Sequence, residues 1–133
     1  MIAFFDTSAI VPLFFREPHS VAARKAWDEA ERCLAWKWLR VEADAALVRR
    51  KASAEAWNLW RTIEGSIYWI EPEGDWLEHL RSFNRGVGLR AADAGHLYVM
   101  ERCASGIENL TLVSFDCEMT QMAHRRGLNV LNS

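Results

Sequence analysis

The hydrophobic residues of this chain fall into short continuous runs that alternate with longer segments of helical periodicity. The clearest runs are residues 2–5 (Ile-Ala-Phe-Phe) and 110–114 (Leu-Thr-Leu-Val-Ser). The first has no polar alternation, which is typical of a strand buried on both faces. Glycine and proline punctuate the segments between. The pattern predicts strands over 2–5, 33–36, 68–70, 110–114 and 128–131, and helices over about 6–15, 19–31, 37–53, 54–64, 75–84, 90–104 and 116–126.

The alternation of strands with helices predicts an α/β fold. We expect a three-layer sandwich in which a mostly parallel central sheet is flanked by helices. The chain has 133 residues, which fits one domain and is long enough to bury a core without disulfide bonds. No repeat or linker divides the sequence, so the single domain is expected to span residues 1–133.

The bulk composition excludes several protein classes without selecting one. A net charge of −2 gives no support for binding a polyanion, although it does not exclude one. The three cysteines, Cys33, Cys103 and Cys117, form no CxxC pair, so neither a disulfide framework nor a zinc site is indicated, and we expect a cytoplasmic protein. Residues 1–5 lack the basic region of a signal peptide, and no apolar run reaches the length of a membrane span.

Two aspartates directly follow predicted strands. Asp6 comes after residues 2–5, and Asp116 comes shortly after residues 110–114. Ligands of parallel α/β sheets bind beyond the carboxyl ends of the strands, so we expect both carboxylates at that edge. Each residue also stands at a predicted helix start, where a carboxylate can cap backbone N–H groups. Considered singly, capping explains Asp6 as well as a functional role does, and it explains Asp116 better.

Two further acids interrupt apolar helix faces. Asp93 shares a helical stripe with Leu89, Leu97 and Met100, and Glu42 shares one with Leu39, Ala43, Ala46 and Leu47. A carboxylate on a buried face is costly unless it is paired or bound to a metal. The alternative is pairing on a solvated face, with Arg90 for Asp93 and with Arg40, Arg49 or Arg50 for Glu42.

Together the four carboxylates predict one divalent-metal site. Hard oxygen ligands suit Mg²⁺ or Mn²⁺. Such an ion polarises a phosphate oxygen and activates a water for in-line attack. We expect Asp6, Asp93 and Asp116 to be metal ligands and Glu42 to be a fourth catalytic acid. Helical geometry turns Asp44 away from Glu42, so it is left out of the site.

The segments that carry these acids resemble the PIN-domain nucleases and, within them, the VapC-type toxins of type II toxin–antitoxin pairs. The similarity covers essentially the whole chain in the right order. It lies in FFDTSA (4–9), VEA (41–43) with AL (46–47), LRAADAGHL (89–97), LVSFD (112–116) and AHRRGLNV (123–130).

The resemblance implies a Mg²⁺- or Mn²⁺-dependent endoribonuclease that hydrolyses RNA phosphodiester bonds with an activated water. It makes Asp6, Glu42, Asp93 and Asp116 the acidic quartet. Thr7 and Ser114 are similar to hydroxyl residues that orient a carboxylate or a water near the metal. The resemblance further implies a cognate antitoxin protein that blocks the site, and a homodimer.

Several residues depart from the family pattern or have two interpretations. Gly95 stands where the family often has a bulky apolar residue, and Glu118 could add a ligand two residues after Asp116. His96 could be a metal ligand or a general base, but we favour a structural role because Mg²⁺ prefers oxygen. For the seven tryptophans we favour core packing or an antitoxin groove over base stacking.

Other functions fit the sequence less well. A haloacid-dehalogenase-like phosphatase would need a second aspartate at position 8, where this chain has Ser8. A receiver domain would need a lysine on a late strand, and serine or cysteine hydrolysis would need a nucleophile elbow. The remaining alternative is a catalytically silent PIN-like module that binds protein or RNA. The quartet argues against it, because such a module has little reason to keep carboxylates on apolar helix faces.

Overall fold

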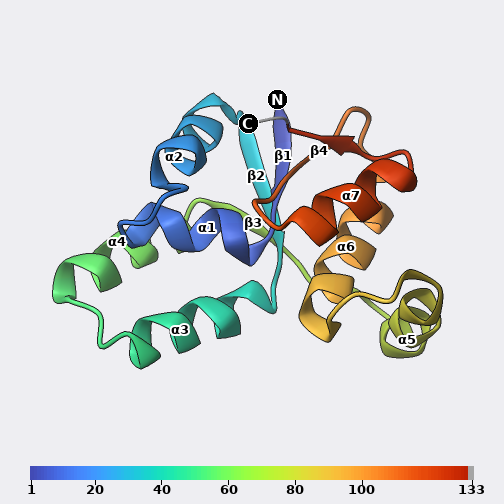
Figure 1. Ribbon diagram of the computed structural model, residues 1–133, viewed down its shortest axis with the longest axis horizontal. Helices are drawn as coiled ribbons and strands as arrows, with labels where there is room; N and C mark the ends of the chain where they lie inside the picture. Colours follow the sequence, from blue (N-terminus) through green and yellow to red (C-terminus); the bar gives the residue numbers. More distant parts are fainter. Residues whose placement is uncertain (132–133) are drawn as a thin grey trace.

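A computed structural model describes residues 1–131 and contains the predicted strands and helices in the predicted order. Figure 1 shows their arrangement. The elements are β1 (Ile2–Phe5), α1 (Thr7–Phe14), α2 (Ser20–Glu29), β2 (Arg32–Trp36), α3 (Leu39–Arg49), α4 (Ala54–Glu64), β3 (Ile67–Ile70), α5 (Trp76–Val87), α6 (Ala91–Ala104), β4 (Thr111–Val113), α7 (Cys117–Arg125) and β5 (Asn129–Val130).

The sheet is parallel throughout, in the order β3-β2-β1-β4-β5. The first strand therefore lies at the centre. The chain adds β2 and β3 on one side of it and then returns to add β4 and β5 on the other. The direction of winding reverses between β1 and β4, and crevices at such reversal points are where α/β sheets bind ligands.

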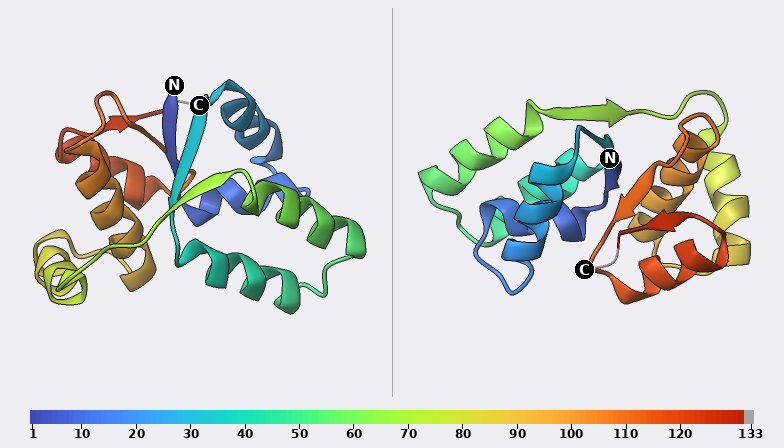
Figure 2. Two further views of the ribbon diagram at one scale, coloured as in Figure 1. Left: turned by 180° about the vertical axis from the view of Figure 1, so that it is seen from behind. Right: turned by 90° about the horizontal axis from the view of Figure 1, so that it is seen from above.

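Helices cover both faces of the sheet, so the predicted three-layer sandwich is confirmed. Alternate residues of β1 point to opposite sides, since Phe5 packs in one core cluster and Phe4 in the other. The core around Phe5 includes side chains of α1 to α4, whereas the core around Phe4 includes side chains of α5 to α7. Figures 1 and 2 show these two groups of helices on opposite sides of the strands.

The predicted helix boundaries differ from the structure mainly where a backbone turn was missed. The helix expected over 37–53 spans only Leu39–Arg49, because Lys51 adopts a left-handed conformation with φ of 51°. The helix expected over about 75–84, with its end at Gly86 or Gly88, spans Trp76–Val87 and ends at Gly88, whose φ of 72° suits glycine. Within residues 1–131, no helix has both the length and the apolar character that crossing a membrane requires.

Candidate active site

Asp6 lies at the reversal point of the sheet, and its carboxylate is fully engaged by hydroxyl groups. The residue is only 1% exposed and joins β1 to α1. Its side chain makes no capping bond to the helix. Instead, Ser8 Oγ donates to Asp6 Oδ1 at 2.6 Å, and Ser114 Oγ donates to Oδ2 at 2.6 Å. The capping interpretation of Asp6 is therefore wrong, and the two serines hold the carboxylate in one orientation.

The same two serines tie the end of β1 to the end of β4. Ser114 Oγ accepts the Asp116 N–H at 3.1 Å, and Ser8 Oγ accepts the Phe115 N–H at 2.9 Å. The two hydroxyl oxygens lie 3.3 Å apart. In Figure 1, α1 and α7 begin side by side near the centre of the view for this reason. Ser8 was not among the predicted site residues, although its place two residues after Asp6 was a signal.

Asp116 does cap a helix. Its Oδ1 accepts the Met119 N–H at 3.0 Å at the start of α7. Within residues 1–131 the other oxygen, Oδ2, accepts no hydrogen bond. The capping interpretation is thus correct for one oxygen of Asp116, while the second oxygen remains available to a ligand.

Asp93 lies in the first turn of α6 and is surrounded by other acids. Burial raises the pKa of its carboxyl, and the negative charges of Asp116, Asp6 and Glu42 raise it further, partly opposed by His96. Within residues 1–131 Asp93 forms no ion pair with an arginine. Asp93 therefore lies within electrostatic reach of the other three predicted carboxylates.

Glu42 belongs to a small network with Thr7 and His96. Its Oε1 accepts from Thr7 Oγ1 at 2.9 Å and lies 2.6 Å from His96 Nε2, while Thr7 Oγ1 and His96 Nε2 are 3.1 Å apart. Burial opposes ionisation of Glu42, but the hydrogen bonds and charge of these partners hold its pKa below the ordinary value. The arginine alternative is wrong for Glu42, because among residues 1–131 its carboxylate contacts His96 and pairs with none of Arg40, Arg49 and Arg50.

A tryptophan holds His96 in this position. His96 is 1% exposed, and its ring meets the Trp36 ring edge-on, with centroids 5.2 Å apart. The same indole covers Gly95, where a Cβ atom would lie 2.3 Å from the Trp36 ring. Gly95 is therefore required at this close approach, which explains why the chain lacks the bulky residue that the family often has there. Buried His96 Nδ1 has no hydrogen-bond partner among residues 1–131.

No family model matches this sequence, and neither does any curated protein. Solved structures do match the fold. PAE2754 from Pyrobaculum aerophilum aligns with a TM-score of 0.70 at 24% identity, over 98% of this chain and 89% of that one. VapC20 of Mycobacterium tuberculosis, a toxin that cleaves the sarcin–ricin loop, gives 0.73 at 18% identity over 90% and 93%. FitAcB of Neisseria gonorrhoeae gives 0.65 at 17% identity over 98% and 97%.

This chain has a PIN-like fold. Identities of 17–24% establish the fold rather than the activity. The shared fold agrees with the fold that the resemblance to PIN-domain proteins implies.

Within this PIN-like domain, three carboxylates fit a divalent cation by their chemistry. No group of three or more acidic, histidine or cysteine side chains in residues 1–131 is drawn together closely enough to form a ready-made metal site. Asp6, Asp93 and Asp116 nevertheless offer hard oxygen donors, and the charges of Asp116 and Asp6 raise the pKa of Asp93, an effect that a bound cation would oppose. Thr7 and His96 hold Glu42 through its Oε1 alone, and two serines hold Asp6 through both of its oxygens.

Two other acids near these positions in sequence lie outside the carboxylate group. Glu118 is exposed in the first turn of α7 and is not among the charges that shift the pKa of Asp93. Asp44 accepts a hydrogen bond from Trp60 Nε1 at 3.2 Å, as expected if the helix turns it away from Glu42.

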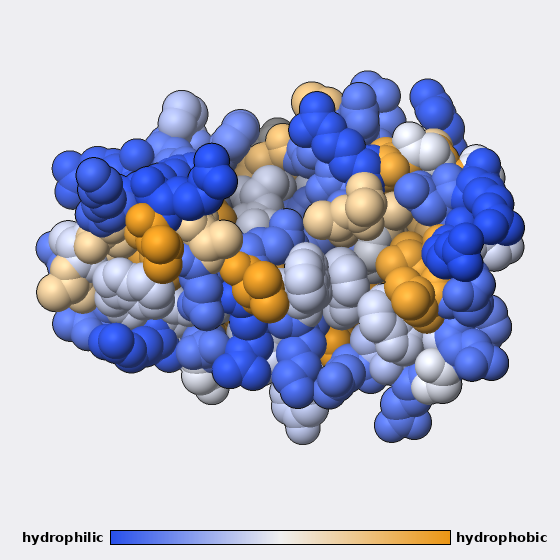
Figure 3. Space-filling model, turned by 90° about the horizontal axis from the view of Figure 1, so that it is seen from below, coloured by the Kyte–Doolittle hydropathy of each residue, from blue (hydrophilic) through white to orange (hydrophobic). Residues whose placement is uncertain are grey.

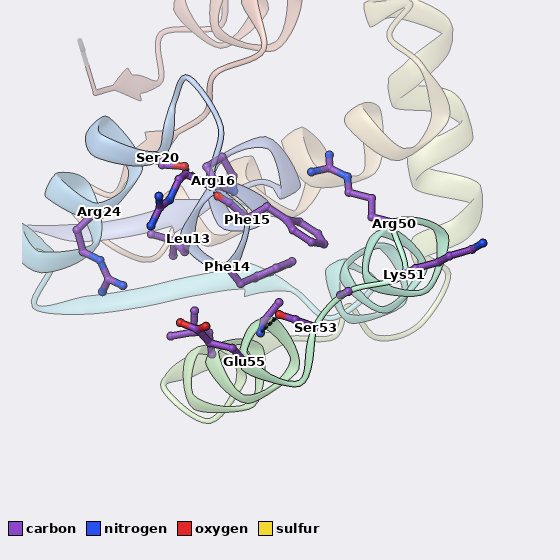
Figure 4. Close-up of a pocket in the computed structure, with 14 residues that line it drawn as sticks. Leu13, Phe14, Phe15, Arg16, Ser20, Arg24, Arg50, Lys51, Ser53 and Glu55 are labelled. Carbon is purple, nitrogen blue, oxygen red and sulfur yellow. Dashed lines mark hydrogen bonds between the residues drawn. The ribbon is translucent and has the colours of Figure 1, made fainter.

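A hollow on the surface of the PIN-like domain lies away from these carboxylates. It has a volume of about 540 Å³ and lies where the end of α1 meets the connection from α3 to α4. Figure 4 shows Phe14 and Phe15 inside it, with Arg16, Arg24 and Arg50 around them. Asp6 stands at the opposite end of α1. This hollow is therefore separate from the carboxylates.

Proposed function

We propose that this protein is a metal-dependent endoribonuclease that acts as the toxin of a toxin–antitoxin pair. The observation that carries the proposal is that Asp93 lies within electrostatic reach of Asp6, Glu42 and Asp116, and that Asp6 and Asp116 follow the two strands between which the winding of the sheet reverses. The fold supports it, because VapC20, which shares the fold, is a toxin that cleaves the sarcin–ricin loop.

Asp6, Asp93 and Asp116 would hold Mg²⁺ or Mn²⁺, which would supply a polarised phosphate oxygen and an activated water. The residues of the chain then have distinct tasks. Ser8 and Ser114 fix both oxygens of Asp6, so this ligand is oriented before the ion arrives. His96 and Thr7 keep Glu42 ionised and in place, so that its carboxylate can accept a hydrogen bond from a water.

The proposed assembly is a homodimer. Val41 and Val48 lie two helical turns apart on α3 and are 50% and 65% exposed. Figure 3 views the molecule from below, the side on which α3 lies in Figure 1, and shows hydrophobic patches separated by hydrophilic residues. Two copies could bury these valines against each other, in a small contact with a polar rim.

The proposed protein partner is a cognate antitoxin. The hollow of Figure 4 suits a peptide with both apolar and acidic side chains, because Leu13, Phe14 and Phe15 are apolar and arginines surround them. Arg50 lies over the Phe15 ring, with its guanidinium carbon 4.5 Å from the ring centroid, and pairs with Glu17. An acidic peptide could take the place of Glu17 in that exposed pair.

The test is cleavage of RNA by the purified protein with and without divalent metal. We expect cleavage with Mg²⁺ or Mn²⁺ and none after treatment with EDTA. Asp6→Asn and Asp93→Asn should each reduce the rate at least about 100-fold, in line with losses for groups that act directly on the reacting atoms. Asp44→Asn is the matched control, since Asp44 lies on α3 but bonds to Trp60, and it should retain full activity.

Two results would overturn this proposal. Equal cleavage by EDTA-treated protein would contradict the metal mechanism. Folded wild-type protein that binds RNA or an antitoxin but cleaves no RNA under any metal condition would instead support the catalytically silent module.

A further inference from the structure

Trp38 presents a large aromatic face at the edge of the carboxylate region. The residue is 48% exposed, and it lies between the end of β2 and the first residue of α3. Its carbonyl accepts the backbone N–H of Glu42 at 3.3 Å. One helical turn therefore separates this ring from a residue of the proposed active site.

The exposed ring is held by buried aromatic neighbours. Its centroid lies 6.2 Å from that of Trp36, with an interplanar angle of 33°. Trp36 in turn contacts Trp76 and His96, with centroids 6.4 and 5.2 Å away, and packs against Gly95. A continuous series of rings thus links Trp38 to the histidine that holds Glu42. A ring fixed in this way loses little conformational entropy when a ligand stacks on it.

Two cationic residues, Lys37 and Arg40, stand within two positions of Trp38 in the sequence, and the Arg40 guanidinium lies over the Trp69 ring, 5.8 Å from its centroid. Lys37 pairs with Glu71 at 3.0 Å, and Arg40 pairs with Glu64 at 2.8 Å. Both cations are nearly half exposed, and ion pairs of this kind contribute little to stability, so both can exchange a carboxylate for a phosphate. An exposed aromatic residue with cationic residues close to it in the chain is a composition found in grooves that bind single-stranded nucleic acids.

The charge of the molecule favours stacking as a source of affinity. The net charge is −2, and the site itself is a group of carboxylates, so attraction of phosphates alone is weak. Stacking on an aromatic ring does not depend on net charge and works with any base. A base inside a duplex has no free face, so this contact selects unpaired nucleotides.

We propose that Trp38 is a stacking platform for an unpaired base of single-stranded RNA, and that Lys37 and Arg40 contact the adjacent phosphates. The inference rests on the proposed ribonuclease function and specifies its substrate as an unpaired segment. A protein interface at Trp38 is the competing possibility, because Trp38 lies three residues before Val41 on the exposed side of α3.

The experiment measures RNA binding without cleavage. The Asp93→Asn protein with Mg²⁺ is titrated into three labelled oligomers, namely a single strand, its duplex and a ribose-phosphate chain without bases. Fluorescence anisotropy gives each affinity. Adding Trp38→Ala should weaken binding of the single strand by roughly 5- to 100-fold, which is the range for the loss of one stacked base. Trp38→Phe should stay within a few-fold of its parent, and the chain without bases should bind both proteins equally.

Two further variants serve as controls. Tyr68→Ala removes another exposed aromatic ring, which is 66% exposed on the edge strand β3, and should leave binding unchanged. Val48→Glu disturbs the exposed side of α3 two turns beyond Val41, and should alter the oligomeric state measured by light scattering without weakening RNA binding.

The inference is overturned if the folded Trp38→Ala variant binds the single strand as tightly as its parent. It is also overturned if Trp38→Ala and Val48→Glu both dissociate the dimer and neither specifically weakens binding of the single strand, since Trp38 would then belong to a protein interface. Failure of the parent to bind any RNA would contradict both this inference and the proposed function, whereas an inert Trp38→Ala change would contradict this inference alone.

Discussion

The two aspartates that follow central strands differ in what their carboxylates bind. Asp6 and Asp116 both precede helices, yet only Asp116 caps one. The difference comes from Ser8 and Ser114, which donate to both oxygens of Asp6 and leave neither for the helix. Ser114, which directly follows β4 and is distant from Asp6 in sequence, therefore helps to determine what the Asp6 carboxylate binds.

Replacing Ser114 tests this arrangement. Ser114→Ala removes a 2.6 Å donor from a buried carboxylate, and should lower the free energy of unfolding by about 1–3 kcal/mol. RNA cleavage should fall as well, because Asp6 loses its fixed orientation. Urea denaturation is the measurement. Ser105→Ala is the control, since Ser105 is exposed at the end of α6. Equal effects of the two substitutions would show that the buried bond is unimportant.

The raised pKa of Asp93 predicts that the difference in Tm between the wild type and Asp93→Asn depends on pH. Its pKa is raised in the folded protein by burial and by the neighbouring acids, so its ionised form destabilises the fold. In metal-free protein at pH 7, Asp93→Asn should therefore raise Tm relative to the wild type. This advantage should shrink as the pH falls through the raised pKa of Asp93, because the wild-type carboxyl then becomes neutral too. A Tm difference that is constant between pH 7 and pH 4 would contradict this explanation.

At the scale of elements, α6 has two roles: it positions side chains of the proposed active site, and it allows close packing against β2. It carries Asp93 and His96 toward the other acids, and it lets β2 approach closely through Gly95. Glycine weakens a helix interior by roughly 0.5–1 kcal/mol relative to alanine. The helix retains it because the Trp36 indole occupies the space that a side chain would need.

The effect of Gly95→Ala on the free energy of unfolding should change sign when Trp36 is replaced. Gly95→Ala should lower the free energy of unfolding by about 1–3 kcal/mol, as overpacking does, and should reduce cleavage by moving Trp36 and hence His96. In a Trp36→Leu background the same change should be neutral or stabilising, because only the gain in helix propensity remains. Gly86→Ala in α5 is the control, since its Cβ would meet no atom within 4 Å. Additive effects of the two substitutions would show that Trp36 and Gly95 do not compete for space.

At the scale of the whole molecule, the order of the strands brings the site together. Asp6 and Asp116 are far apart in sequence but follow adjacent parallel strands, and α3 and α6 contribute Glu42 and Asp93 from opposite layers. The carboxylates therefore join the two halves of the domain. The charges of the other three acids raise the pKa of Asp93, and a bound cation would oppose this effect.

Divalent metal should accordingly stabilise the whole domain. At 100 times its dissociation constant, Mg²⁺ or Mn²⁺ should add about 2.7 kcal/mol, which for a domain of this size raises Tm by roughly 6–12 °C. Asp93→Asn should lose most of this shift, and Asp44→Asn should keep it. Thermal denaturation with increasing metal is the measurement. A shift of equal size in Asp93→Asn would place the ion elsewhere.

Most of the fold could be predicted because local patterns determine it. The apolar run at residues 2–5 forms a strand buried on both faces, and the stripes that Glu42 and Asp93 interrupt do face the core. Helix ends were less predictable. The end of α3 near Lys51 depends on a left-handed backbone conformation, and the residue there is not a glycine that would have indicated it in the sequence.

The sequence by itself determined the α/β layering and the four candidate carboxylates, because hydrophobic periodicity and charge on an apolar face are local properties. Only the tertiary structure decided what each carboxylate contacts. The bonds of Asp6 to Ser114, of Glu42 to His96 and the contact of Trp36 with Gly95 join residues 50 or more positions apart. Such contacts depend on the order and register of the strands, which no local pattern contains.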